Sequence, residues 1–256
     1  MTAAPTGPTA PRATLPGPLV RRRRKTLLLV GVLALVIGVY VLPAYTGLNP
    51  TTSRVAVSNL APWHYAALLV HIFPAVIALV VGPLQFSAVL RRHRRIHRAI
   101  GRVYVGSVVL ASLGGAVVGA LSAAGPTAWV GFVLLDVLWA TITIAGWRAA
   151  RAHRYADHAV WLTRSYALTF AGVTLRVWYI LLILALQPLL GSWFHGDGNL
   201  LMSQAYLVTP WISWVPNLII GETLVARLRR QLANPRPRIA VAARNGPTPL
   251  DTAPTA

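Results

Sequence analysis

Six runs of mostly apolar residues, each about twenty residues long, constrain this chain more than any other feature of its sequence. An α-helix rises 1.5 Å per residue, so about 20 apolar residues cross the ~30 Å hydrocarbon core of a bilayer. The runs are 26–48, 62–84, 103–124, 127–147, 166–190 and 205–226. They predict an all-α, polytopic integral membrane helix bundle with six transmembrane helices.

The composition agrees with a chain that lies in lipid. Hydrophobic residues make up 55% of the 256 residues and charged residues only 11%, too few for a soluble domain of this length. A formal net charge of +19 is typical of proteins that bind nucleic acid, but the positions of the arginines explain it as membrane topology, so we expect no nucleic-acid partner. The chain has no Cys, which excludes disulfides, thiol nucleophiles and thiolate metal sites.

The basic residues lie almost entirely on one side of the predicted helices. If the N-terminus is cytoplasmic, that side receives the clusters at 21–25, 91–102, 148–154 and 227–244. Only Arg54 lies on the opposite side, and Arg164 and Arg176 lie on the fifth predicted helix. Because cytoplasmic loops carry the excess of Lys and Arg, we expect both termini in the cytoplasm and a multi-pass protein of the plasma membrane. Its arginine clusters are suited to contact anionic lipid headgroups.

The two ends of the chain differ in composition from the middle. They are rich in Pro, Thr and Ala and poor in large apolar residues, so we expect disordered cytoplasmic tails at 1–25 and 231–256 around a transmembrane domain at 26–230. The basic stretch 21–25 before an apolar run also resembles a secretory signal. Because this run is longer than a signal core and five more runs follow it, we expect the first helix to be retained.

A few ionisable residues lie inside the predicted spans. A charge inside a bilayer is costly, so such residues face protein or water and find partners. Asp136 and Arg176 lie at comparable depth on antiparallel neighbouring helices, which predicts an ion pair between them, either an architectural clamp or part of a functional site. Arg164 and Glu222 lie near the cytoplasmic ends of the fifth and sixth helices, which predicts a structural salt bridge.

Two helices carry one-sided patterns of small or polar residues. On the third helix, Ala111, Gly115 and Gly119 repeat every four residues and indicate close helix packing. On the fifth helix, residues at steps of three and four share one face, which we expect to face the bundle. They are His158, Leu162, Ser165, Thr169, Gly172 and Arg176.

Among the histidines, His71 is the strongest single candidate for function. It lies at about the level of Asp136 in an otherwise apolar run, and a hydrogen-bonded structural His is the alternative. His97 and His158 lie at the cytoplasmic starts of the third and fifth helices, in the same leaflet. His93 and His97 are four residues apart, but the six nearby arginines repel a cation, so we expect no metal site there.

Several segments together resemble a family of bacterial multi-pass membrane proteins, domain of unknown function 2306. They are GPLQF at 82–86, LRR at 90–92, HRAIGRVY at 97–104, the segment 158–161, RSYALTFAGVTLRVW at 164–178 and PNLIIGE at 216–222. The resemblance covers roughly 70–222. It implies a bacterial membrane protein and supplies no activity. Asp136 lies outside the segments that carry it.

Three functions remain open from the sequence. The first is small-molecule or ion binding and transport through a buried polar site of His71, Asp136 and Arg176. The second is a b-type haem electron-transfer protein, with His97 and His158 as iron ligands. The third is a structural or regulatory membrane subunit. Motifs of hydrolases, metalloproteases and nucleotide-binding enzymes are absent from the sequence, so an enzyme is not favoured. The sequence predicts no oligomeric state.

Overall fold

The computed structural model describes residues 18–55, 63–121 and 125–233. All regular structure in these ranges is helical, which confirms the predicted all-α fold. The elements are α1 Pro18–Val41, α2 Pro43–Thr46, η1 Pro50–Thr52, α3 Trp63–Gln85, α4 Ala88–Arg92, α5 Arg94–Ala120, α6 Pro126–Arg151, α7 Tyr155–Thr169, α8 Ala171–Leu186, η2 Gln187–Leu189 and α9 Gly198–Ala233. Helix α1 begins at Pro18, so the boundary expected at residue 25 falls inside it. Residues 1–17 and 234–256 of the expected tails lie outside the described residues.

Five helical segments in the described part of the chain are long and apolar enough to cross a membrane. They are Arg24–Val41, Trp63–Gln85, Arg94–Ala120, Pro126–Arg151 and Tyr155–Leu189. The sixth predicted run lies within α9, which is long enough at 36 residues but less apolar, since it contains Pro210, Pro216, Asn217 and Glu222. The membrane fold is therefore established, whereas the count of six spans stays a prediction.

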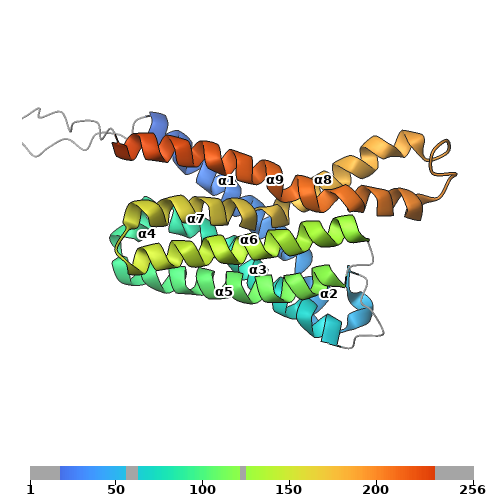
Figure 1. Ribbon diagram of the computed structural model, residues 1–256, viewed down its shortest axis with the longest axis horizontal. Helices are drawn as coiled ribbons and strands as arrows, with labels where there is room; N and C mark the ends of the chain where they lie inside the picture. The colour runs from blue at the N-terminus through green and yellow to red at the C-terminus, as the bar shows by residue number, and fades with distance from the viewer. Residues whose placement is uncertain (1–17, 56–62, 122–124, 234–256) are drawn as a thin grey trace, which may run out of the picture.

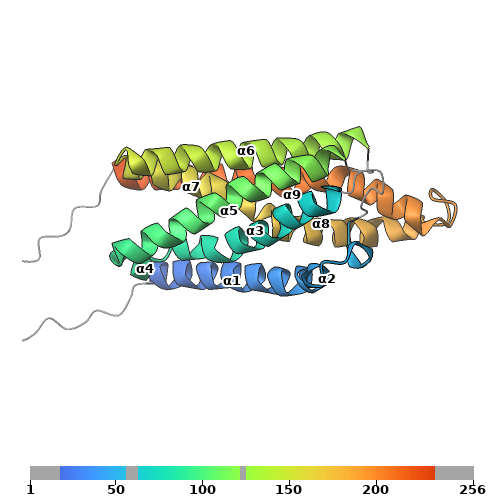
Figure 2. The ribbon, with the colours of Figure 1, turned by 90° about the horizontal axis from the view of Figure 1, so that it is seen from below.

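Four helices form the centre of the molecule. Helix α5 packs between α3 and α6, and α7 packs on α6 and contacts α3 (Figure 1). Helix α1 lies against α3 and α8, while α9 lies along α8, α7 and α6 (Figure 2). The start of α5 and the connection from α6 to α7 meet at one end, on the left in Figure 1. We call this the arginine-rich end, because it carries Arg91, Arg92, Arg94, Arg95, Arg148, Arg151 and Arg154.

The fifth predicted span is divided into two helices. Helix α7 ends at Thr169 and α8 begins at Ala171, and the N–H groups of Val173 and Thr174 both donate to the Phe170 carbonyl. The chain changes course there: α7 stays with the central helices, whereas α8 packs mainly on α9. The α8–α9 hairpin consequently projects past the end of α6 (Figure 1).

Glycines on α5 set how closely the central helices approach. A Cβ atom on Gly114 would lie 2.6 Å from the Ala67 carbonyl oxygen and 2.7 Å from the His71 amide nitrogen. The backbones of α3 and α5 therefore touch at this crossing. A Cβ on Gly119 would lie 3.0 Å from the Cβ of Phe132 on α6. Gly119 of the small-residue repeat and the adjacent Gly114 thus allow close packing against helices on both sides of α5.

Candidate functional site

The innermost polar groups lie where α3, α5 and α6 meet. His71 Nδ1 lies 2.8 Å from the carbonyl oxygen of Ala111. A carbonyl oxygen only accepts, so Nδ1 carries the hydrogen and Nε2 keeps a lone pair. A Cβ on Gly115 would lie 2.5 Å from both His71 Nδ1 and Asp136 Oδ2, which places these two atoms within about 5 Å of each other. The prediction that His71 and Asp136 share one level of the bundle agrees with this geometry.

Asp136 is buried without a partner. Asp136 is only 4% exposed. Among the described residues, its carboxyl group has neither a hydrogen bond nor an ion pair. Burial of a polar group without a hydrogen bond costs several kcal/mol, roughly 2–7 depending on the reference state. Asp136 is therefore costly unless a water molecule or a ligand pairs with its carboxyl group.

The predicted ion pair between Asp136 and Arg176 is wrong. Within the described ranges, the salt bridges are Arg154–Asp157 and Arg164–Glu222. The break at Phe170 explains the difference, because it turns α8 toward α9 and away from α6. Arg176 donates instead to the Gly172 carbonyl, one turn earlier on its own helix.

Arg176 acts on His71 through its charge but lies among other neighbours. Its electrostatic neighbours are Tyr45, Tyr206, Tyr40 and Arg54, and its charge also acts on His71. The Tyr206 ring in turn contacts the ring of Phe132, with centroids 5.8 Å apart. Phe132 precedes Asp136 by one turn of α6, so both lie on one face of that helix. His71 is thus the group that the two others share: its imidazole lies near the Asp136 carboxyl and is acted on by the Arg176 charge, whereas Arg176 and Asp136 do not act on each other.

A second polar cluster lies midway along the central helices. Ser165 and Thr169 are buried, as the stripe on the fifth predicted helix indicates. The Tyr104 hydroxyl lies 2.7 Å from Ser165 Oγ and 2.8 Å from Thr169 Oγ1. The sequence reasoning missed Tyr104, Trp139 and Thr143 as partners. Two of them have a readable signal, because Trp139 and Thr143 follow Asp136 at three and seven residues, on one face of α6.

Arg164 and Glu222 form a bidentate salt bridge. Arg164 Nε lies 2.5 Å from Glu222 Oε1, and Nη2 lies 2.9 Å from Oε2. The Arg164 guanidinium also lies over the Trp161 ring, 4.9 Å from its centroid. The side chains are 17% and 47% exposed, so this pair is far more open to water than Asp136, which is 4% exposed. It connects α7 to α9.

His97 and His158 lie near each other at the arginine-rich end. His158 Nδ1 lies 2.9 Å from the Gly146 carbonyl oxygen and donates to it, as His71 does to Ala111. His97 Nδ1 is buried without a hydrogen-bond partner, and its electrostatic neighbours include His158. His93 is exposed at the start of α5. The described residues hold no group of three His, Cys, Asp or Glu suited to a metal ion.

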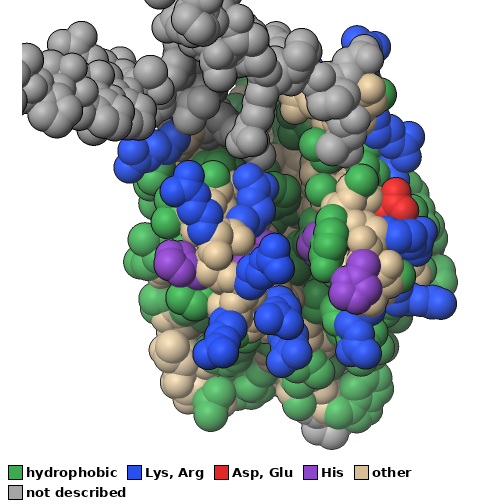
Figure 3. Space-filling view, turned by 90° about the vertical axis from the view of Figure 1, so that its left-hand side faces the viewer, with side chains coloured by type: hydrophobic (Ala, Val, Ile, Leu, Met, Phe, Trp, Pro, Cys, Tyr) green, Lys and Arg blue, Asp and Glu red, His purple; other side chains and the backbone are tan. Residues whose placement is uncertain are grey.

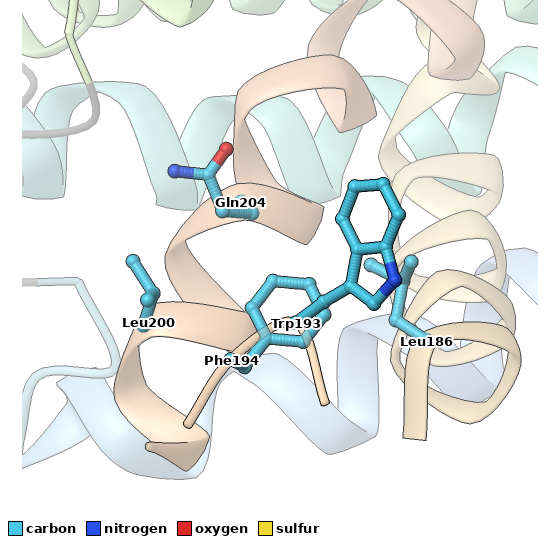
Figure 4. Close-up of a pocket in the computed structure, with 5 residues that line it drawn as sticks. All are labelled: Leu186, Trp193, Phe194, Leu200 and Gln204. Atoms are coloured by element: carbon cyan, nitrogen blue, oxygen red, sulfur yellow. The ribbon is translucent and has the colours of Figure 1, made fainter. Parts of the chain in front are cut away.

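Two surface hollows lie at opposite ends of the molecule. Figure 3 views the arginine-rich end, where Arg and His side chains surround a hollow, and Arg92, His93, Arg94, Arg95 and Ile96 line a pocket there. Figure 4 shows the other, on the projecting hairpin, lined by Leu186, Trp193, Phe194, Leu200 and Gln204. Neither lining set includes His71, Asp136 or Arg176.

Comparisons with known proteins identify a family and no activity. A family model described as a predicted membrane protein, DUF2306, matches residues 68–225. The match runs from α3 into α9 and includes the three ionisable residues of the buried site. No curated protein and no solved structure matches the chain.

Proposed function

This chain belongs to the DUF2306 family of predicted membrane proteins, and we propose that it binds and transports a small polar or ionic ligand through a site formed by His71, Asp136 and Arg176. The description of the family names no activity. The proposal therefore depends on the geometry of the three side chains.

One observation carries the proposal: His71 lies close to Asp136 and within the field of the Arg176 charge, and none of these three ionisable groups inside the bundle is paired with another. Asp136 has no protein partner among the described residues, and Arg176 bonds only to a carbonyl of its own helix. Ionisable residues inside a membrane are costly and mark ligand or ion pathways. A ligand with both donor and acceptor groups would pair with all three, since Asp136 accepts, Arg176 donates and His71 Nε2 accepts.

The test is a thermal-stability screen of the purified protein in mild detergent. The compounds are amino acids, carboxylates, amines and inorganic ions. Binding to the folded state raises the melting temperature by mass action. We expect at least one compound to stabilise the wild type but neither Asp136→Asn nor Arg176→Gln. Asp157→Asn is the matched control, because Asp157 is an exposed carboxylate paired with Arg154. A screen in which no compound separates wild type from these two variants would contradict the proposal.

A b-type haem is the second candidate, favoured by the buried, unpartnered Nδ1 of His97 beside His158. The donor set fits: the Nδ1 hydrogen bond of His158 to Gly146 leaves its Nε2 free, as in most metal-ligating histidines. Haem bound there would supply one-electron transfer, with His97 and His158 as ligands.

An absorption spectrum of protein from haem-replete cells, oxidised and dithionite-reduced, decides this second candidate. A Soret band and a sharp reduced α-band that persist in His93→Ala but vanish in His158→Ala would support it. A featureless wild-type spectrum would remove it.

The third candidate is a structural or regulatory subunit whose arginine-rich end binds anionic lipid headgroups on the cytoplasmic face of the plasma membrane. The pocket of Arg92, Arg94, Arg95 and His93 supports it, since polybasic segments gain about 1 kcal/mol per basic residue near an anionic surface. The purified protein should then be stabilised by phosphatidylglycerol and not by phosphatidylcholine, and Arg94→Gln with Arg95→Gln should remove the difference.

A further inference from the structure

We propose that Arg176, together with the hydroxyl groups of Tyr45 and Tyr206, binds a small oxyanion such as a carboxylate or a phosphate, and that the exposed Arg54 attracts it. This binding deepens the proposed function, on which it rests for the role of Arg176, and names the charge of the ligand. The four residues come from four parts of the chain, namely α8, α2, α9 and the segment that follows η1.

Helix α8 carries Arg176 between α9 and α1, both of which it contacts. Tyr179 follows Arg176 by three residues, so the two side chains share one face of α8. The Tyr206 ring of α9 packs edge-on against the Tyr179 ring, with centroids 5.6 Å apart. Tyr206 therefore lies beside the face of α8 that carries Arg176, and both Tyr206 and Tyr45 are electrostatic neighbours of the Arg176 guanidinium.

The corner formed by α1, α2 and η1 brings Tyr45 and Arg54 to the same region. Tyr45 is buried, at 1% exposed. Thr52 Oγ1 donates to the Ala44 carbonyl over 2.8 Å, which ties the turn before Arg54 to α2. Arg54 Nη2 donates to the Tyr40 carbonyl over 3.3 Å, and its guanidinium lies 4.1 Å from the centroid of the Tyr40 ring. Arg54 is thus held in place while exposed to solvent, and its charge acts on Arg176.

The two guanidinium groups have no acidic partner among the described residues. Arg176 donates to the Gly172 carbonyl, and Arg54 donates to the Tyr40 carbonyl. The acidic residues within the described ranges either bond elsewhere or are not neighbours of Arg176: Asp136, Asp157, Asp197 and Glu222. Two like charges that act on each other without a counter-ion are costly inside a membrane protein. An anion bound beside Arg176 would supply the missing negative charge.

The donors at this place suit the oxygen atoms of an oxyanion. A guanidinium carries five N–H donors in a fixed fork that matches carboxylate and phosphate oxygens. The Gly172 carbonyl accepts from only one nitrogen of Arg176, Nη1. Within the described ranges, the hydroxyls of Tyr45 and Tyr206 have no hydrogen-bond partner, so both are free to donate as well.

Thermal unfolding of the purified protein in mild detergent tests the oxyanion site. Sodium chloride is replaced by sodium acetate or sodium phosphate at constant ionic strength, so that only the anion changes. We expect at least one of the two oxyanions to raise the melting temperature along a saturating curve, because it binds the folded state. Arg176→Gln should remove this response. Tyr206→Phe keeps the ring and should weaken the affinity about tenfold, the effect of losing one hydrogen bond to a charged group.

A charge reversal tests the part played by the exposed arginine. Arg54→Glu should weaken the affinity by at least about tenfold, because a carboxylate there repels the anion. Arg151→Glu is the matched control, since Arg151 is also exposed and its guanidinium also lies over an aromatic ring, 5.7 Å from the Trp147 centroid. Its affinity should equal that of the wild type. The melting temperature in chloride shows whether each variant is folded.

Equal melting temperatures of the wild type in chloride, acetate and phosphate would overturn the oxyanion site. So would a rise that does not saturate and is the same in Arg176→Gln, because salts excluded from the protein surface stabilise any folded protein in that way. If the compounds that stabilise the protein are all cations that require Asp136 and Arg176, the proposed function stands and the oxyanion is wrong. An oxyanion response that is lost in Arg176→Gln but kept in Asp136→Asn would support the oxyanion site and contradict the wider site.

Discussion

At the scale of single residues, position 115 controls whether His71 and Asp136 can share one region. We expect Gly115→Ala to displace them, because its Cβ would lie 2.5 Å from an atom of each. Both atoms belong to side chains that can move aside, so we expect the site to be disturbed more than the fold. The predicted destabilisation is about 1 kcal/mol, the lower end of the overpacking range, and ligand stabilisation should be lost. Thermal unfolding in detergent measures both effects.

The matched control for this prediction lies on the same helix. A Cβ on Gly106 would meet no atom within 4 Å. Because Ala is favoured over Gly in a helix, Gly106→Ala should leave binding unchanged and raise stability by about 0.5–1 kcal/mol. Equal gains of stability in the two variants would show that Gly115 behaves as an ordinary helical glycine and that its contacts with His71 and Asp136 do not matter.

The sequence predicted which polar residues are buried more reliably than it predicted which of them pair. His71 and Asp136 are visible as polar residues in apolar runs, and their common depth follows from counting residues along two helices. The prediction of an Asp136–Arg176 pair failed because the break at Phe170 carries Arg176 on α8 away from α6, and counting residues along one run does not reveal that break. Tyr104 was missed because tyrosine is common in membrane helices, and its hydroxyl partners lie 61 and 65 residues away in sequence.

At the scale of helices, the sequence did not predict the break between α7 and α8. No proline lies between 155 and 186, and the run 166–190 is mostly apolar, so periodicity predicts one straight helix. The backbone turns at Phe170 because α7 packs among the central helices while α8 packs on α9. Tertiary contacts set the position of this break, and the pattern of residue types along the sequence does not reveal those contacts.

The crossing of α3 and α5 gives a prediction at this scale. Gly114→Ala would place a Cβ within 2.6 Å of the Ala67 carbonyl and 2.7 Å of the His71 amide. Backbone atoms cannot rotate away as side-chain ends do, so the two helices must separate. We expect a loss of about 3 kcal/mol, the upper end of the overpacking range, measured by thermal unfolding in detergent. A loss no larger than that of Gly115→Ala would contradict this difference between backbone and side-chain contacts.

The Arg164–Glu222 salt bridge gives the second prediction for helices, because it connects α7 to α9. Glu222→Gln keeps the shape and removes the charge, and since Glu222 is 47% exposed we expect a loss of only about 0.5–1 kcal/mol. The charge reversal Arg164→Glu with Glu222→Arg should recover part of what either single reversal loses. Additive losses in the double variant would show that the two side chains do not interact in the membrane.

At the scale of the whole molecule, the open question of topology is whether α9 crosses the membrane. Helix α9 is not among the five segments that meet the length and hydropathy requirement for crossing a membrane. Its contacts nevertheless favour a sixth crossing. It lies along α8, α7 and α6 over a length of 36 residues, which is about 54 Å at 1.5 Å per residue. Helices packed side by side over such a length cross the same bilayer together. The end of α9 also carries Arg227, Arg229 and Arg230, at the arginine-rich end.

Cysteine labelling on intact cells decides between five and six crossings, and a chain without native Cys is suited to it. Ser192, Ala152 and Gln231 are exposed in the α8–α9 connection, after α6 and near the end of α9. With six crossings and cytoplasmic termini, a membrane-impermeant maleimide should label Ser192→Cys at once, and Ala152→Cys and Gln231→Cys only after the membrane is opened. Immediate labelling of Gln231→Cys together with Ser192→Cys would mean that α9 stays on the outer side. The bidentate pair of Glu222 with Arg164, which lies toward the arginine-rich end of α7, would then be inconsistent with the topology of the chain in the membrane.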